Sequence, residues 1–285
     1  MSESVSIGGH TIRVTNLDRV MYPAAGTTKA EVLDYLLAVA ALLGHQLRDR
    51  LLTRRRWPHG VAEESFFEKN LPAHAPAWIP TVTAGRDPVR YPVLREAVPQ
   101  APLAWFAQMG VLEFHVPQWR AAADGTPEPP DRIVVDLDPG APAGLPECAV
   151  VAVAVRDAVA GLGLTAQPVL SCSKGMQVYL PLPPSGPVAR GLSPEGAAEF
   201  AHGLATTLTE AMPDLVVSRM TRSLRPGKVF LDWSQNNGSK TTVAPYSPRG
   251  TALPQVAAPV TWAEVEAGGL VQLTMADVLV REGLD

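Results

Sequence analysis

Two aspartates separated by one residue, Asp136 and Asp138, follow three β-branched residues in a stretch that ends at Pro139-Gly140. The β-branched run predicts a buried strand, and the Pro-Gly pair predicts its end. Because successive side chains of a strand point to opposite faces, the two carboxylates share one face. Neighbouring carboxylates repel each other, and a divalent cation such as Mg²⁺ or Mn²⁺, which prefers hard oxygen ligands, relieves that repulsion. The pair therefore indicates either a metal site or a solvated acidic turn.

Two later segments supply a phosphate-type loop and a third acid. Residues 169–180 contain two apolar strands around a turn of small residues that carries Lys174, which predicts a β-hairpin. Small residues let backbone N–H groups approach an anion, and the lysine adds positive charge. Asp232 ends another apolar strand, residues 228–232. Three acids beside such a loop are the groups needed for two-metal phosphoryl transfer, so together they favour that chemistry over a solvated turn.

Eight short blocks along nearly the whole chain carry a further signal. They are residues 14–20 (VTNLDRV), 22–23 (YP), 26–29 (GTTK), 56–58 (RWP), 66–69 (FFEK), 113–119 (EFHVPQW), 136–140 (DLDPG) and 229–236 (VFLDWSQN). In this order they resemble the polymerase domain of bacterial ATP-dependent DNA ligase D, a member of the archaeo-eukaryotic primase superfamily. The resemblance implies a nucleotidyltransferase whose catalytic metal ligands, for two Mn²⁺ or Mg²⁺ ions, are Asp136, Asp138 and Asp232.

The resemblance also assigns binding residues around the acids. Those implied at the nucleotide site are His115, Ser171, Lys174, Gln235 and Arg249. Taken alone, His115 could be a hydrogen-bonded strand histidine, which is the commoner case. Arg19 and Lys29 occupy the positions at which the family binds the 5′-phosphate of a DNA gap, and an arginine keeps the charge while adding bidentate geometry. Lys29 also falls in the first turn of a predicted helix, where unpaired N–H groups and the helix dipole favour an anion; simple solvation of this lysine is the alternative.

Two phenylalanines and a run of arginines are the expected DNA template contacts. By resemblance, Phe66 and Phe67 stack on a template base, a contact worth about 1–3 kcal/mol per base. Packing of both rings in the core is the alternative. Segment 86–95 resembles a loop that helps bring two DNA ends together. The residues expected to bind template phosphates are Arg54, Arg55 and Arg56.

Two positions depart from the family pattern. Cys172 stands where the family usually has glycine, and Gln177 stands where it has histidine. Glycine allows close approach of the backbone to phosphate, so a thiol at this position is expected to narrow the loop. Glutamine donates a hydrogen bond but cannot carry the charge of a protonated ring. Because the three acids are intact, we expect altered nucleotide affinity or slower chemistry rather than inactivity.

Composition limits the class of protein. With 285 residues, 46% hydrophobic and 18% charged, the chain is typical of a globular protein with a large core. Its two cysteines, Cys148 and Cys172, match neither a zinc spacing nor a disulfide framework, which fits a reducing cytoplasm. The resemblance to a DNA-repair enzyme implies association with the nucleoid. We expect no signal segment and no membrane contact.

The distribution of charge matters more than its total. The net charge of −4 argues against nucleic acid as a partner. However, residues 48–56 contain five arginines and residues 219–228 contain four cations without an acid. Each cluster alone could be a solvated surface, whereas both beside a metal site predict an electropositive track for phosphates.

Periodicity predicts the order of the elements. A capping box at Thr28 and Glu31 opens a helix whose apolar face runs through residues 32–43. Residues 85–99 are predicted to be a loop and 113–116 a strand. The aspartate strand is followed by a helix at 147–164, the hairpin, a helix at 194–212 and the Asp232 strand. This β-α-β-β-α-β order is the split βαβ, RRM-like pattern.

The predicted fold class is therefore α+β. The resemblance implies an archaeo-eukaryotic primase-like fold in which the RRM-like catalytic core packs against an N-terminal α/β subdomain. The chain is predicted to be one domain, residues 1–285, made of a DNA-binding part (1–115), the catalytic core (116–250) and a C-terminal helical extension (251–285).

The expected function is template-dependent nucleotide addition by a primase-polymerase that fills gaps and extends ends in bacterial non-homologous end joining. The resemblance implies a preference for ribonucleotides and for Mn²⁺. It implies DNA with 5′-phosphate gaps or 3′ overhangs and nucleoside triphosphates as ligands, with Ku and a DNA ligase as partners. Two alternatives stay open. The first is a DNA-end binding or synapsis module with weak catalysis, which Cys172 and Gln177 motivate. The second is a replication-type primase, which the 5′-phosphate residues Arg19 and Lys29 disfavour.

Overall fold

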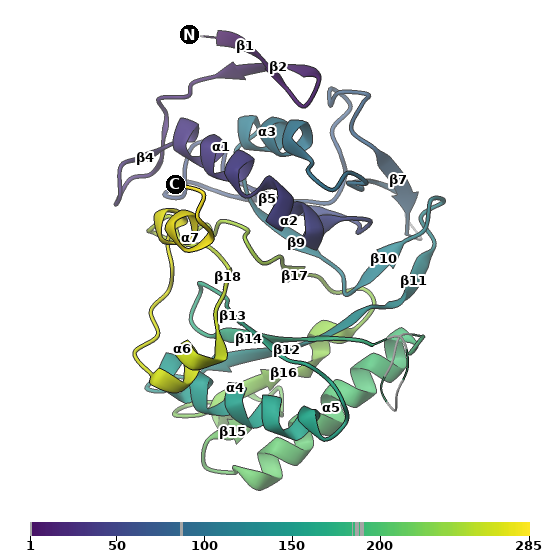
Figure 1. Cartoon of the computed structure of the whole chain (residues 1–285), viewed down its shortest axis with the longest axis vertical. Coiled ribbons are helices and arrows are strands. Elements are labelled where there is room, and N and C mark those ends of the chain that lie inside the picture. The colour runs from purple at the N-terminus through teal and green to yellow at the C-terminus, as the bar shows by residue number, and fades with distance from the viewer. Residues whose placement is uncertain (1, 86–87, 184, 186–187, 189–190) are drawn as a thin grey trace.

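The chain folds into two lobes, each a sheet covered by helices, with one lobe above the other in Figure 1. The computed structural model describes residues 2–85, 88–183, 185, 188 and 191–285. The sheet of the N-terminal lobe has the strand order β17-β9-β5-β6. These strands are β5 (Thr53–Arg56), β6 (Phe66–Glu68), β9 (Val111–Val116) and β17 (Thr242–Val243). The predicted strand at 113–116 is thus confirmed as part of β9.

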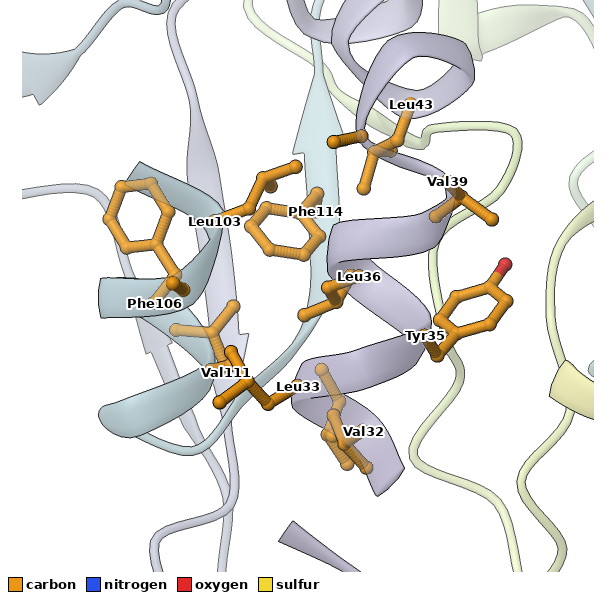
Figure 2. Close-up of a cluster of buried hydrophobic side chains, with 14 of the residues drawn as sticks. Val32, Leu33, Tyr35, Leu36, Val39, Leu43, Leu103, Phe106, Val111 and Phe114 are labelled. Carbon is orange, nitrogen blue, oxygen red and sulfur yellow. The ribbon is translucent and has the colours of Figure 1, made fainter. Parts of the chain in front are cut away.

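Three helices contribute much of the core of this lobe, together with its strands: α1 (Lys29–Ala38), α2 (Ala40–Leu47) and α3 (Gln100–Gln108). The predicted capping box is confirmed, because the Thr28 side chain accepts from the Glu31 amide. The predicted single helix is wrong, since it breaks at Val39 with a 73° bend. All the residues labelled in Figure 2 belong to one buried apolar cluster; Leu43, after the break, lies on the side of Leu36 and Phe114, whereas Val39 lies on the side of Tyr35.

The C-terminal lobe holds the predicted split βαβ arrangement. Its six strands follow the order β15-β16-β12-β14-β13-β18, and the central neighbours β16, β12, β14 and β13 are antiparallel. The strands are β12 (Arg132–Pro139), β13 (Gln167–Leu170), β14 (Met176–Pro181), β15 (Val216–Val217), β16 (Val229–Asp232) and β18 (Ala258–Pro259). The helices are α4 (Leu145–Ala160) and α5 (Pro194–Ala211), close to their predicted ranges.

The two faces of β12 have different roles. Ile133, Val135 and Leu137 are fully or almost fully buried in the cluster that packs α4 and α5 on one face of the sheet. The alternate residues, Val134 and Asp136 among them, therefore point to the opposite face, toward the N-terminal lobe. This alternation places the predicted chemistry between the two lobes.

Four short hairpins complete the strands. They pair β1 (Ser2–Ile7) with β2 (His10–Thr15), β3 (Val20–Tyr22) with β4 (Thr27–Thr28), β7 (Thr81–Ala84) with β8 (Val89–Pro92), and β10 (Trp119–Ala121) with β11 (Pro127–Pro130). The prediction of a loop over residues 85–99 is wrong at β8, which pairs with β7 in register. Residues 86 and 87, the start of the segment expected to bring DNA ends together, lie outside the described residues.

The last part of the chain ties the lobes together. β17 belongs to the N-terminal sheet, whereas β18 extends the C-terminal sheet. After α6 (Trp262–Ala267), α7 (Met275–Glu282) returns to pack near α1, as the yellow helix of Figure 1 shows. The two sheets therefore do not follow the predicted divisions at 115 and 250. Among the described residues no single helix is long and apolar enough to cross a membrane; the bent pair α1 and α2 meets that test only by length and composition.

Candidate active site

The three predicted metal ligands meet in the middle of the C-terminal sheet. Asp136 on β12 lies directly opposite Asp232 on β16, and Asp138 follows on the same face of β12. One carboxylate oxygen from each can be chosen so that all three lie within 4.8 Å of one another. The register of two antiparallel strands thus assembles residues that are nearly a hundred positions apart.

The raised pKa values of two of these acids indicate that neighbouring positive charges do not neutralise the cluster. Burial and the neighbouring charge of Asp138 raise the pKa of Asp136 to about 8. Burial and Asp232 likewise raise the pKa of Asp138, against the opposing charges of Arg225 and Lys174. Three hard oxygen donors whose mutual repulsion is not neutralised fit a divalent cation.

Asp232 is held in place by its own strand end. Its Oδ1 accepts from the Ser234 amide at 3.1 Å, and its Oδ2 accepts from Gln235 Nε2 at 2.8 Å. Lys240 donates to the Ser234 hydroxyl, which in turn donates to Asp232. Gln235, predicted at the nucleotide site, therefore orients a metal ligand, and Lys240 is a nearby cation that the sequence reading missed.

A buried carboxylate organises the opposite wall. Glu113, 3% exposed in its side chain, accepts from His115 Nε2 at 2.8 Å, and its other oxygen lies 3.5 Å from Arg249 Nε. It also accepts from the Gly250 amide at 3.0 Å. Tyr22 donates to the Arg249 carbonyl at 2.9 Å. The two predicted nucleotide-binding residues are thus positioned by one acid.

Glu113 was not predicted as a functional residue, although it lies in the same block as His115. The pKa of Glu113 falls to about 2. Burial by itself would raise this pKa, but the hydrogen bond from His115 and the charge of Arg249 together lower it by more. Glu113 is therefore ionised at neutral pH. Because His115 Nε2 donates to Glu113, Nδ1 is the ring nitrogen left for another partner.

The hairpin between β13 and β14 forms the predicted loop beside the acids. Lys174 is exposed at its tip. Gly175 is required there, because a Cβ at this position would lie 1.9 Å from the Leu137 carbonyl oxygen, between the two aspartates of β12. Ser171 points across the loop, where its hydroxyl donates to the Gly175 carbonyl at 2.9 Å. The loop is thus fixed against the metal-ligand strand.

The expectation that Cys172 narrows this loop is wrong. Cys172 has a left-handed backbone (φ 49°), which turns its thiol into the core, 3.7 Å from the Leu273 carbonyl oxygen. Its amide donates to Gln272 Oε1 at 3.0 Å, and Gln272 Nε2 reaches the Gly175 carbonyl at 3.4 Å. Gln272, like Lys240 and Glu113, was not predicted from the sequence, since it comes from a segment a hundred residues later.

The other departure from the family pattern lies at the centre of the site. Gln177 on β14 is opposite Asp136 in the strand register, and its hydrogen bond to Asp136 lowers the pKa of that acid. Its Oε1 also accepts from the Tyr179 hydroxyl at 3.2 Å. Gln177 is 4% exposed. It therefore acts on a metal ligand through a neutral hydrogen bond.

A cavity of about 220 Å³ joins these groups. Asp232 adjoins this cavity through its hydrogen bond with Gln235, and Lys174 adjoins it from the tip of the β13–β14 hairpin. Its lining residues, from both lobes, are His115, Asp136, Asp138, Ser171, Ser173, Gln177, Gln235, Thr241, Thr242, Val243 and Arg249.

The predicted 5′-phosphate pair is arranged differently from the expectation. Lys29 is 7% exposed, and its Nζ donates to the Thr15 carbonyl at 2.9 Å and to Gln108 Oε1 at 2.7 Å. The expectation of unpaired first-turn N–H groups is wrong, because the amide of Lys29 donates to the Arg19 carbonyl and that of Ala30 to the carbonyl of residue 17. Burial, with the charge of Arg19, lowers the pKa of Lys29 to about 8. Phosphate binding by these two residues stays a prediction.

The three arginines predicted to bind template phosphates divide into one that is buried, Arg54, and two that reach the surface, Arg55 and Arg56. Arg54 is 1% exposed and donates to the Asn70 carbonyl at 2.9 Å, so its assignment to a template phosphate is corrected: its guanidinium is inside the N-terminal lobe. Arg55 is 43% exposed in its side chain, and Arg56 pairs with Glu68 at 2.7 Å.

The two phenylalanines are both exposed, at 42% for Phe66 and 55% for Phe67, which excludes the core-packing alternative. The Arg56 guanidinium lies over the Phe66 ring at 4.9 Å, and Phe67 meets His115 edge to face at 5.3 Å. Exposed rings next to the cavity suit stacking against a base, which stays a prediction.

Comparison with known proteins decides the family. The family model described as "LigD, primase-polymerase domain" matches residues 28–283. The chain belongs to this family. The resemblance read from the sequence blocks is thereby confirmed.

Relatives of the LigD family bear this out. The multifunctional non-homologous end joining DNA repair protein LigD of Mycobacterium tuberculosis H37Rv is 48% identical, over 96% of this chain and 36% of the relative. The bifunctional LigD of Bacillus subtilis is 31% identical over 94% of this chain and 42% of the relative. The chain thus spans well under half the length of these relatives. Among solved structures, the polymerase domain from M. tuberculosis ligase D in complex with DNA matches with TM-score 0.89 and 47% identity, covering 96% of this chain and 95% of that one.

Proposed function

We propose that this chain is a template-dependent nucleotidyltransferase that fills gaps and extends DNA ends in bacterial non-homologous end joining. The observation that carries the proposal is the meeting of Asp136, Asp138 and Asp232 beside the cavity that holds His115 and Arg249. Membership in the LigD primase-polymerase family supports it. The fold is proposed to be that of the archaeo-eukaryotic primases, whose catalytic core the split βαβ sheet resembles.

The residues of the chain divide the work between metal and nucleotide. The three acids would hold two divalent cations, Mn²⁺ or Mg²⁺. When bound, these cations would activate the primer 3′-hydroxyl and neutralise the charge of the departing pyrophosphate. Arg249 and Lys174 supply positive charge for the triphosphate, and Glu113 holds His115 and Arg249 in place. Arg19 and Lys29 are proposed to recognise a 5′-phosphate across the gap, and ribonucleotides are the preferred substrates.

The setting of the reaction follows from the family. Ku and a DNA ligase are the proposed partners, because an extended end still has to be held and sealed. The cytoplasm, in association with the nucleoid, is the proposed location. The alternative of an end-binding module with weak catalysis rests on Gln177 alone, since the thiol of Cys172 points away from the loop.

The test is extension of a primer across a one-nucleotide gap with Mn²⁺ present. We expect extension by the wild type, faster with a 5′-phosphate on the downstream strand and faster with ribonucleotides than with deoxyribonucleotides. Asp232→Asn should abolish extension, whereas Asp157→Asn, which removes an exposed acid of α4, should not. Tight binding of the gapped DNA by the wild type without any extension would overturn the proposal in favour of an end-binding module.

A further inference from the structure

A second cavity lies between the lobes, toward the other end of β12 from the acids. Its volume is about 320 Å³, within the range of roughly 300–1,000 Å³ of small-molecule sites. Among the described residues, it shares no lining residue with the cavity of the acids. Arg132 lines it and lies four residues before Asp136 on β12, a separation of about 13 Å along a strand.

Positive charge gathers in the walls of this cavity. Arg50, Arg120 and Arg132 line it, and Asp131 is the single acid among the described lining residues. Arg50 Nη2 donates to both oxygens of Asp131 at 2.7 Å, and Arg120 Nε donates to one of them at 2.8 Å. Outside the lining, Asp49 lies 3.9 Å from Arg120 but is shared with Arg95 and Arg48, so the arginines around the cavity still outnumber the acids. The proposed polymerase site uses none of these arginines.

The excess charge is felt by the neighbouring groups. Burial and the charge of Arg132 lower the pKa of Arg50 to about 9, although Asp131 opposes the shift. Burial and the arginines, Arg120 first among them, also lower the pKa of His45, another lining residue. Burial is the larger cause of both shifts, and repulsion from the neighbouring arginines adds to it.

Arg132 is the residue that a purely structural role explains least. It is 7% exposed, and its guanidinium donates to neutral acceptors, Gln118 Oε1 at 2.8 Å and Gln46 Oε1 at 3.0 Å. Its Nη2 has no hydrogen-bond partner among the described residues, and neither has Arg50 Nε. The compensation for this buried cation is the nearby charge of Asp131, which two other arginines share, and the Tyr179 ring 5.1 Å from the guanidinium. An anion in the cavity would offset the remaining cost of its burial.

We propose that this cavity is an anion site that binds a phosphate group. Arginine suits phosphate, because its planar donors match two oxygens at once and its charge is permanent. The phosphate can come from a small free anion, such as inorganic phosphate or pyrophosphate, or from a nucleic-acid backbone. Both share the chemistry that the three arginines recognise.

The test is calorimetric titration with inorganic pyrophosphate in the absence of divalent cations. Gln46→Glu places a carboxylate, nearly the same shape as the amide that it replaces, against Arg132 Nη1. The variant thus gives Arg132 a counter-charge from the protein itself without changing the packing. We expect at least tenfold weaker pyrophosphate binding by this variant, with an unchanged or higher Tm. Gln100→Glu, at the exposed start of α3, makes the same change in net charge away from the cavity and should bind like the wild type.

A further variant separates this site from the polymerase cavity. Lys174→Ala removes the cation at the tip of the hairpin loop and should keep the pyrophosphate binding that Gln46→Glu loses. A parallel titration with single-stranded DNA identifies the source of the phosphate. Weaker DNA binding by Gln46→Glu would point to the backbone, and a loss confined to pyrophosphate would point to a free anion. Equal pyrophosphate affinity of Gln46→Glu and wild type, or no binding by either, would overturn the proposal, whatever the outcome of the primer-extension test.

Discussion

At the scale of single residues, the site is a balance of buried charges. Asp136 and Asp138 are held close together, and the charges of Arg249, Arg225 and Lys174 offset their raised pKa values only in part. Glu113 on the opposite wall instead pairs with Arg249 and Arg55 and accepts a hydrogen bond from His115. The sequence alone identified the first two, because a D-x-D pattern at a strand end is short and local. Glu113 could not be identified that way, since its partners Arg249 and Gly250 lie far along the chain and only the fold brings them together.

The pKa of Asp136 predicts how pH controls metal binding. With a folded-state pKa of about 8 against an ordinary value of 3.8, Asp136 retains a proton that a cation must displace. Mn²⁺ affinity should therefore rise as pH increases from 6 to 8, by up to about tenfold per pH unit. By the same linkage, the metal-free protein should lose stability as pH rises over that range. Calorimetric Mn²⁺ titrations at several pH values check the first point, and a flat profile would contradict it.

Glu113 predicts a division between binding and chemistry. Glu113→Gln removes the charge that orients His115 and Arg249 but leaves the three metal ligands in place. We expect the KM for the nucleotide to rise about tenfold, because that factor corresponds to the loss of one charge-assisted hydrogen bond. The effect on kcat should be smaller. Steady-state kinetics measure both. Glu266→Gln, in an exposed ion pair with Arg156, is the matched control. An unchanged KM in Glu113→Gln would refute the positioning role.

At the scale of elements, register decides the geometry. Asp136 is opposite Asp232 on one side and Gln177 on the other, so a slip of one residue in either pairing would turn a site residue into the helical face. The strand, hairpin and helix order was predictable, because apolar periodicity and turn residues are local signals. The break at Val39 was not, since packing against distant segments determines it. The strand β8 was missed although its partner β7 is close in sequence, because the prolines and arginines of residues 85–99 are typical of a loop.

Gly175 tests the fit between the hairpin and β12. Gly175→Ala would bring a methyl group to within 1.9 Å of the Leu137 carbonyl oxygen, so the loop must move away from the aspartates. We expect a loss of about 1–3 kcal/mol in the free energy of unfolding, as for other overpacked sites, together with lower activity. Gly203→Ala, with open space around it in α5, should be neutral or stabilising by up to about 1 kcal/mol. Denaturant unfolding compares them, and equal stabilities would contradict the account.

At the scale of the whole molecule, the chain crosses between lobes more often than the sequence suggested. β17 joins the N-terminal sheet, β18 the C-terminal sheet, and α7 returns to the N-terminal core through Met275 and Val278. The predicted C-terminal extension is thus a structural tie between the lobes. No local pattern shows such a return, because the residues of α7 form an ordinary amphipathic helix until their partner is known.

This tie predicts that the lobes unfold together. Val278 is fully buried on α7, whereas Val280, two residues later, is 65% exposed. Val278→Ala should lower the free energy of unfolding by about 2 kcal/mol through the cavity that it leaves, and the unfolding should stay a single transition. Val280→Ala should change little. Calorimetry provides both readings. Two separate transitions in the wild type would contradict a shared core.

The most direct test of the central claim is single-nucleotide incorporation by the wild type and by Asp138→Asn with Mn²⁺ present. We expect the variant to have an unchanged or higher Tm, because it loses a repelling buried charge, and to keep its DNA affinity. We expect its rate to fall roughly a thousandfold, since a metal ligand supplies several kcal/mol of transition-state stabilisation. Incorporation by Asp138→Asn at the rate of the wild type would contradict the assignment of the three aspartates as the catalytic centre.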